Sequence, residues 1–326
     1  MSVTFSAGRR PHRARLDRVL GVSKPSLRGV YVPIITPFSE EGAVATDALE
    51  ALGRRLLDDG VAGLVPLGTA GEGALLEHEE RRLVIDACAR VCSDRGAQLI
   101  VGTGSNNTRQ TVQAVRELDG THALAGLLCL VPYYLRPTQA GIRAHFEAVA
   151  DASPAPIVVY NIPFRTGVRA SAETLLALAE HPNIAGIKHS VGAIDEDTEQ
   201  LLAASPPDFA VLSGDDAHLA AVTLLGGAGG ITASAHVCTR RWVALVAAAL
   251  GSEAETARAH QADLLPVVAA GFREPSPAVF KGVLYQRGEI PSANVRLPFL
   301  PASEQSVTRA IEAIERADEA LTSQIG

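Results

Sequence analysis

From residue 30 onward the chain repeats one pattern: a short apolar run, then a polar or glycine-rich loop, then a stretch with apolar residues at helical spacing. A short apolar run between turn signals is typical of a buried strand, and apolar positions at i, i+3, i+4 and i+7 indicate an amphipathic helix. In residues 77–92, for example, such a stripe is formed by Leu83, Val84, Ala87, Cys88 and Val91. The predicted strands are residues 30–36, 63–67, 98–102, 126–131, 157–161, 185–188, 209–213 and 229–232.

Strands that alternate with helices predict parallel βαβ units, and eight such units in an unbroken series predict an α/β fold of the TIM (β/α)8 barrel type. An open doubly wound sheet is the alternative, but no G-x-G-x-x-G motif follows the first strand, which disfavours dinucleotide binding. Beyond the eighth unit, one helical stretch closes the barrel and the others form a small C-terminal appendage. We therefore expect a barrel domain over residues 29–250 and a helical region over residues 251–326.

Composition agrees with a compact globular protein and narrows its setting. Of 326 residues, 47% are hydrophobic and 20% are charged, and no apolar run reaches the length of a membrane span. The four cysteines lack zinc-type spacing and there is no secretory signal, so we expect free thiols in a reducing cytoplasm, with neither a metal nor a membrane partner.

The formal charge is unevenly distributed along the chain. Residues 1–28 carry a net charge of +6, whereas the whole chain carries −7. A basic tail of this kind can contact nucleic acid or an acidic surface. We interpret it instead as a disordered N-terminal extension, leave it out of the fold prediction, and expect no nucleic-acid partner.

Candidate chemistry gathers where the predicted strands end, and Lys188 is its most informative member. Lysine is seldom buried without compensation, yet Lys188 ends an apolar run that otherwise indicates a core strand. Burial disfavours a charged amine, and a neutral amine is a nucleophile toward carbonyl groups, so the position suggests a Schiff base. The alternatives are a lysine that reaches solvent or pairs with a carboxylate. Other polar groups at strand ends are Thr36, Thr69, Glu72, Thr103, Asn106, Tyr133, Tyr134, Tyr160, Asn161, Arg165, Asp215, Asp216, Thr232 and Ser234.

Five motifs, in this order and spacing, resemble the dihydrodipicolinate synthase/N-acetylneuraminate lyase family. They are residues 68–72 (GTAGE), 132–139 (PYYLRPTQ), 160–167 (YNIPFRTG), 186–188 (GIK) and 213–216 (SGDD). The likeness extends from about residue 30 to residue 298. It implies a TIM barrel whose lysine forms an imine with pyruvate, without a cofactor.

The resemblance also implies roles for individual residues. Lys188 would be the nucleophile and Tyr160 the proton shuttle, while Thr69 would link Tyr160 to a Tyr134 donated by a neighbouring subunit. The backbone N–H groups of Thr69 and Ala70 would hold the pyruvate carboxylate, since oriented amides suit an anion. Ile231 and Gly214 would complete the substrate pocket. A tyrosine donated by a neighbouring subunit implies a homo-oligomer, which we expect to be a dimer of dimers. Its partners would be small-molecule 2-keto acid and aldehyde substrates.

Several of these residues also have structural interpretations. Tyr133 and Tyr134 would suit a packed aromatic corner, and Thr69 a turn. Asp215 with Asp216 is expected to cap the following helix, and His189 to be a loop or rim residue.

Arg165 bears on the second substrate, because its planar guanidinium suits a carboxylate. Arginine before Thr-Gly at this place looks like the synthases, where it engages the carboxylate of aspartate semialdehyde; pairing with a nearby acid is the alternative. We therefore expect a lyase that condenses pyruvate with L-aspartate 4-semialdehyde, giving 4-hydroxy-tetrahydrodipicolinate for lysine biosynthesis.

Two departures keep other functions open. Ala70 stands where the family usually has a second threonine, and Leu135 where asparagine is common. A pyruvate-dependent aldolase or dehydratase acting on a 2-keto-3-deoxy sugar acid, 4-hydroxy-2-oxoglutarate or a related 2-keto acid is the alternative. The non-enzymatic alternative is a ligand-binding relative that has lost catalytic activity.

The candidate effector site is only partly present. His78, Asn106 and Tyr133 fit the lysine site of some relatives, but Arg81 and Gln110 replace a histidine and a glutamate there. We predict weak or no inhibition by lysine; tight lysine binding in calorimetry would contradict this.

Overall fold

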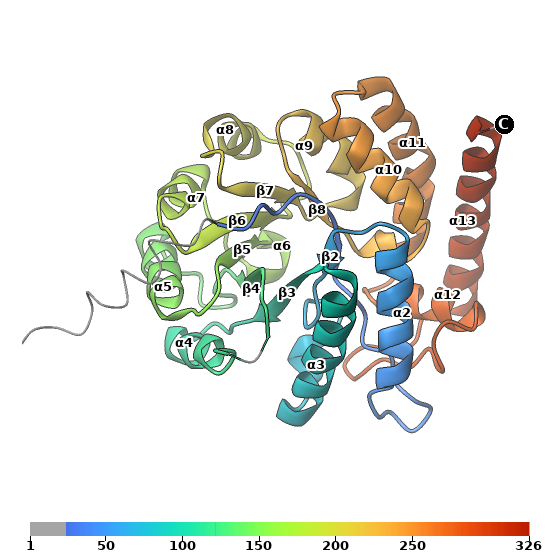
Figure 1. The fold of residues 1–326 in the computed structure, drawn as a ribbon, viewed down its shortest axis with the longest axis horizontal. Helices are drawn as coiled ribbons and strands as arrows, with labels where there is room; N and C mark the ends of the chain where they lie inside the picture. Colours follow the sequence, from blue (N-terminus) through green and yellow to red (C-terminus); the bar gives the residue numbers. More distant parts are fainter. Residues whose placement is uncertain (1–23, 121, 326) are drawn as a thin grey trace, which may run out of the picture.

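The computed structural model describes residues 24–120 and 122–325, and its eight parallel strands close into a barrel (Figure 1). Each strand pairs with its neighbour in the sequence, and the last pairs with the first. This confirms the predicted TIM-barrel fold. The strands are β1 Gly29–Val32, β2 Gly63–Leu64, β3 Gln98–Thr103, β4 Gly126–Leu130, β5 Ile157–Asn161, β6 Ile184–His189, β7 Ala210–Ser213 and β8 Gly229–Ile231.

Helices surround the barrel, and three more follow it in the sequence (Figure 1). Of the additional helices, α11 packs against both α10 and α13, and α12 packs against α13. The helices around the barrel are α2 Thr46–Asp58, α3 His78–Arg95, α4 Thr108–Arg116, α5 Gln139–Ala152, α6 Pro163–Thr166, α7 Ala172–Ala179, α8 Glu196–Ala204, α9 Leu219–Leu224 and α10 Thr239–Leu250. The helices after it are α11 Ala254–Gly271, α12 Ala278–Gln286 and α13 Glu304–Ile325.

The first two strands are shorter than the sequence predicts. Residues 30–35 and 63–67 form the apolar runs, but β1 ends at Val32, directly before Pro33, and β2 ends at Leu64, two residues before Pro66. Proline has no N–H to donate to a strand ladder, so pairing stops there. The chain beyond each proline is therefore free to form the loops above the barrel.

The last residues of the predicted extension pack against the barrel. Leu27 is 2% exposed and belongs to the apolar cluster that fills the barrel interior, which also contains Tyr31. Lys24 Nζ lies 3.1 Å from Asp208 Oδ2 and donates to the Ala179 carbonyl. The predicted disordered segment is thus wrong for residues 24–28, and residues 1–23 lie outside the described residues.

A buried histidine, His236, connects the segments that follow the first and the last strand of the barrel. His236 Nε2 accepts a hydrogen bond from the Ile35 N–H at 3.0 Å, and Nδ1 lies 2.7 Å from the Ala233 carbonyl. Because Nε2 accepts, the ring proton sits on Nδ1 and is donated to Ala233. Burial lowers the pKa of His236 to about 4, so the ring is neutral at pH 7. This neutral ring joins the segment after β1 to the segment after β8.

We predict that acid weakens this connection. The pKa of His236 is lower in the folded chain than its ordinary 6.5, so the unfolded chain takes up the proton first and stability falls as pH drops from 6.5 toward 4. At pH 5 the loss relative to pH 7 is about 2 kcal/mol for this residue alone.

Urea unfolding of the wild-type protein and of His236→Gln at pH 7 and pH 5 measures the effect. Other buried groups titrate in both proteins, so the difference between the two pH dependences isolates His236. The variant should lose less stability on acidification; equal losses would contradict the assignment.

Candidate active site

Lys188 and Tyr160 face each other inside the barrel. They are direct register partners on β6 and β5, so their side chains leave the sheet on the same side. Lys188 is 6% exposed, and its Nζ lies 4.4 Å from the centre of the Tyr160 ring. The tyrosine ring therefore forms one wall against the lysine amine.

Lys188 differs from the other two lysines of the chain in having no carboxylate partner. Lys24 is ion-paired with Asp208 and Lys281 with Glu72. Among the described residues, Lys188 Nζ has neither a hydrogen bond nor an ion pair, and its burial keeps it from reaching solvent. Neither structural alternative for this lysine is therefore observed, and its amine is available to react.

Lys188 lines a cavity of about 320 Å³ at the carboxyl ends of the strands. This is the end at which barrel enzymes place their chemistry. The structure brings together most of the residues predicted for the site: the cavity is lined by Thr69, Ala70, Tyr160, Arg165, Lys188, Gly214 and Ile231.

The loop after β2 presents unpaired amides to this cavity. The backbone N–H groups of Thr69 and Ala70 have no hydrogen-bond partner within residues 24–120 and 122–325, although Ala70 is only 3% exposed. Thr36 Oγ1 donates to the Gly71 carbonyl at 2.7 Å and fixes the loop from the β1 side. Two free, oriented donors of this kind suit a carboxylate.

A buried ion pair fixes the same loop from behind. Glu72 adopts a left-handed backbone conformation, and its side chain and that of Lys281 on α12 are both fully buried. Lys281 Nζ lies 2.6 Å from Glu72 Oε1, and the Arg296 N–H donates to Glu72 Oε2 at 2.7 Å. Burial lowers the pKa of Lys281 to about 8, and the Glu72 carboxylate opposes the shift.

The loop after β7 holds the loop after β6. Asp215 accepts hydrogen bonds from Ser190 Oγ at 2.9 Å and from the Gly192 N–H at 2.7 Å. Asp216 accepts from the Ser234 N–H at 2.7 Å, and burial raises the pKa of Asp216 to about 6. The prediction that Asp215 caps the following helix is wrong, because its carboxylate is taken up by the neighbouring loop.

Arg165 lies at the cavity wall with its charge unpaired. It is exposed on the short helix α6, and its guanidinium stacks over the Phe164 ring at 4.8 Å from the ring centre. Within the described residues no acid pairs with it. The alternative in which Arg165 pairs with a nearby acid is therefore not observed, and the guanidinium faces an open cavity.

Tyr134 does not join the cavity within one chain. Its side chain is 84% exposed and its backbone N–H donates to the Thr166 carbonyl at 3.0 Å. In the described part of the chain, the hydroxyls of Thr69, Tyr160 and Tyr134 form no hydrogen bonds with one another. The exposure also rules out the packed aromatic corner for Tyr134.

The predicted effector residues are not brought together in one cavity. His78 lines a second cavity of about 430 Å³ beside α3 and α4, together with Arg81 and His122. Asn106 and Tyr133 are not among its lining residues.

Sequence reasoning missed the contribution of α11. Val268 and Phe272 line the active-site cavity, and Phe272 is 43% exposed. The spacing of apolar residues in a helix shows which residues lie on the same face of that helix. It does not show which part of the barrel that face packs against. His189 was also placed wrongly: it is 5% exposed and belongs to β6.

Two kinds of feature are absent from residues 24–120 and 122–325. No helix there combines the length and apolar character needed to cross a membrane. No group of three or more histidine, cysteine or acidic side chains there is arranged to hold a metal ion.

Comparison with known proteins agrees with this geometry. The 4-hydroxy-tetrahydrodipicolinate synthase of Salinibacter ruber is 40% identical over 287 residues, which cover 86% of this chain and 92% of the relative. The dihydrodipicolinate synthase of Acinetobacter baumannii, solved in complex with pyruvate, superimposes with a TM-score of 0.84 at 33% identity, covering 89% of this chain and 99% of that one. A structure described as the first monomeric dihydrodipicolinate synthase variant gives a TM-score of 0.86 at 31% identity, covering 90% and 97%. The model of the dihydrodipicolinate synthetase family matches residues 26–317, and the chain belongs to that family.

Proposed function

We propose that this chain condenses pyruvate with L-aspartate 4-semialdehyde to form 4-hydroxy-tetrahydrodipicolinate, through an imine at Lys188. The observation that carries the proposal is the buried, unpaired amine of Lys188 beside Tyr160, in a cavity that also contains two free backbone donors. The names of the relatives support the identity of the reaction.

The donor half of the reaction follows from these groups. The pyruvate carboxylate binds the Thr69 and Ala70 N–H groups, which places its carbonyl carbon near Lys188 Nζ. The amine attacks that carbon, and loss of water gives the imine. Carbinolamine dehydration and enamine formation each move a proton, and Tyr160, whose ring centre lies 4.4 Å from the lysine nitrogen, carries a hydroxyl suited to move it. Because the amides are backbone groups, this arrangement persists with alanine at position 70.

The acceptor half depends on Arg165. Its unpaired guanidinium would bind the carboxylate of the semialdehyde at the cavity wall, as a planar fork suits two carboxylate oxygens. The aldehyde carbon then lies within the cavity, where the enamine carbon attacks it.

We further propose that Tyr134 completes the proton relay in a second copy of the chain. Tyr134 and the adjacent Leu135 are 84% and 61% exposed, as is suited to burial against a partner. The active form would then be at least a dimer, expected to be a dimer of dimers. It would need no cofactor and would work in the cytoplasm, which agrees with four free cysteines.

Removal of the Arg165 charge should weaken binding of the aldehyde alone. In Arg165→Leu we expect a higher KM for aspartate semialdehyde by on the order of ten- to a hundredfold, because a hydrogen bond to a charged group contributes about 1.5–3 kcal/mol. The KM for pyruvate should stay near the wild-type value.

Steady-state turnover with each substrate varied in turn measures the split, with Arg143→Gln as a control on the exposed face of α5. Equal effects on both KM values would contradict the role of Arg165. A wild-type protein that cleaves a 2-keto-3-deoxy sugar acid but does not condense the semialdehyde would overturn the proposed reaction.

A methyl group at position 214 should displace the lysine. A Cβ built on Gly214 would lie 2.9 Å from Lys188 Cε and 2.9 Å from Ser190 Oγ, closer than carbon contacts allow. We expect Gly214→Ala to fold and to form the pyruvate imine more slowly by on the order of ten- to a hundredfold, since small displacements of reacting groups have effects of that size.

The matched control is Gly141→Ala, where a Cβ would meet only ordinary contacts at 3.4 Å. Borohydride trapping of pyruvate over time reports the rate of imine formation. A Gly214→Ala variant that traps pyruvate as fast as the control would refute the packing argument.

A further inference from the structure

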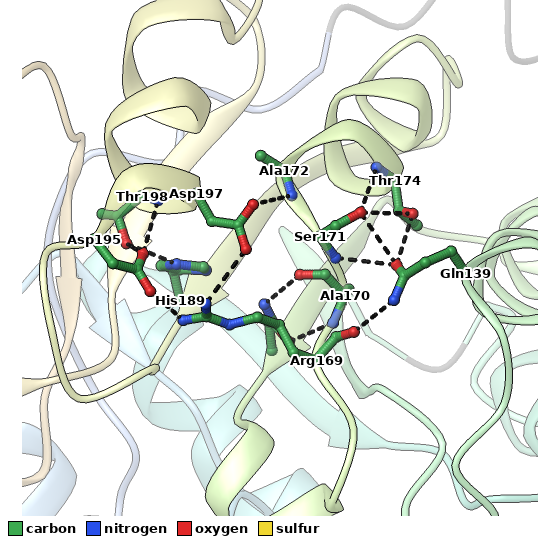
Figure 2. Close-up of polar contacts among 11 residues, drawn as sticks. Gln139, Arg169, Ala170, Ser171, Ala172, Thr174, His189, Asp195, Asp197 and Thr198 are labelled. Atoms are coloured by element: carbon green, nitrogen blue, oxygen red, sulfur yellow. Dashed lines mark hydrogen bonds and ion pairs between the residues drawn. The ribbon is translucent and has the colours of Figure 1, made fainter.

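Arg169 bridges two carboxylates at the start of helix α8, a different segment of the chain (Figure 2). Its guanidinium lies 2.5 Å from Asp195 Oδ2 and 3.3 Å from Asp197 Oδ2. Arg169 follows α6, which carries Arg165, whereas Asp195 and Asp197 lie between β6 and the first turn of α8. One side chain therefore joins the segment that carries Arg165 to the segment that follows Lys188.

A hydrogen-bonded chain continues from Asp195 to the strand of the nucleophile. Asp195 Oδ1 accepts from Thr198 Oγ1 at 2.8 Å, and Thr198 Oγ1 lies 3.2 Å from His189 Nε2 (Figure 2). Since the single hydroxyl proton goes to Asp195, His189 must donate through Nε2. Burial, with the charge of Arg169 adding to it, lowers the pKa of His189 to about 4, so the ring is neutral at pH 7. His189 directly follows Lys188 in β6.

The backbone on either side of Arg169 is held as well. Gln139 at the start of α5 donates to the Arg169 carbonyl at 2.8 Å. The Asn161 side chain makes two hydrogen bonds with the backbone of Ala170, at 3.0 and 3.1 Å, and Asn161 directly follows Tyr160. The position of Arg169 is thus fixed by strand β5, by helix α5 and by the start of helix α8, and it lies four residues beyond Arg165.

Arg165 itself has little to hold it. Its side chain is exposed and sits on a four-residue helix, and its guanidinium stacks over the ring of Phe164, which is 76% exposed. Within residues 24–120 and 122–325 the Arg165 side chain makes no hydrogen bond or ion pair. Lys188, by contrast, lies in a buried strand paired on both sides. If the loops move apart, the arginine is displaced and the lysine is not.

We propose that Arg169 is a positioning residue that sets the place of Arg165 relative to Lys188, and so the binding of the aldehyde carboxylate. The inference rests on the proposed function and deepens it, because it assigns recognition of the second substrate to a salt bridge outside the cavity. Arg169 does not line the cavity and touches no substrate.

The test is the kinetics of Arg169→Gln, which removes the guanidinium and its charge but keeps a polar side chain. We expect kcat/KM for the semialdehyde to fall by on the order of ten- to a hundredfold, through KM. The KM for pyruvate and the rate of borohydride trapping at Lys188 should stay near wild-type values. Arg169→Lys should recover part of the loss, because a single ammonium can still face Asp195. Arg143→Gln, which removes an exposed ion pair with Glu147, is the matched control.

The outcomes separate this inference from the proposed function. If the wild-type protein catalyses the condensation and the Arg169→Gln variant has the same KM for the semialdehyde, the role of Arg169 alone is overturned. The same conclusion follows if the variant loses thermal stability but keeps both KM values unchanged. If the wild-type protein itself does not condense pyruvate with the semialdehyde, the proposed function is overturned, and the role of Arg169 with it.

If Arg169→Gln fails to fold, the double variant Asp195→Asn/Asp197→Asn replaces it, because Arg169 pairs with both carboxylates. Asparagine can still accept the Thr198 N–H at position 195 and the Ala172 N–H at position 197, while both ion pairs with Arg169 are lost. The semialdehyde KM should again rise selectively, and an unchanged value would refute the proposal.

Discussion

The buried ion pair between Glu72 and Lys281 is the constraint on which the active site depends. Both side chains are fully buried, so neither charge has water as a substitute partner. Removing one member of such a pair costs about 3–5 kcal/mol, because the other charge stays buried and unpaired. Glu72 therefore keeps its place, and with it the Thr69 and Ala70 amides that face the cavity.

This constraint explains why the helices after the barrel belong to the catalytic unit. Lys281 lies on α12, and α11 supplies Val268 and Phe272 to the cavity wall. A chain that ended after α10 would close the barrel but would leave Glu72 without its cation. The barrel ends near residue 250, but residues that line the cavity come from both sides of that position in the sequence.

The site also divides its tasks according to rigidity. The nucleophile and its tyrosine lie on paired central strands, where their side chains are fixed by register. The groups that we propose to hold carboxylates lie outside the strands, the Thr69 and Ala70 amides in a loop and Arg165 on the short helix α6. Ion pairs outside the cavity hold these segments: Glu72 with Lys281 behind the amides, and Arg169 with Asp195 and Asp197 beyond Arg165. Loops of this kind can vary in the substrate they recognise while the strands keep the same chemistry.

The barrel and the buried position of Lys188 at a strand end could be predicted from the sequence because both are local patterns. Apolar runs mark the strands, and Lys188 is conspicuous at the end of one of them. The first two strands were overextended because apolar residues continue past Pro33 and Pro66, where backbone pairing ends.

What could not be predicted depends on contacts between distant residues. Lys281 and Glu72 are 209 residues apart, and nothing local marks them as partners. Asp215 resembles a helix cap in sequence, but the loop after β6 lies close enough to take its carboxylate. His189 was expected in a loop or at a rim because it follows Lys188, yet it belongs to β6, is buried, and lies within hydrogen-bonding distance of Thr198 on α8.

The central claim is that Lys188 forms an imine with pyruvate, and the chain is well suited to a direct test because it has only three lysines. The protein would be incubated with pyruvate, reduced with borohydride, digested and mapped by mass spectrometry. We expect one adduct, on the peptide that contains Lys188, and none in Lys188→Ala. A folded wild-type protein that carries no adduct, or carries it on Lys24 or Lys281, would contradict the account.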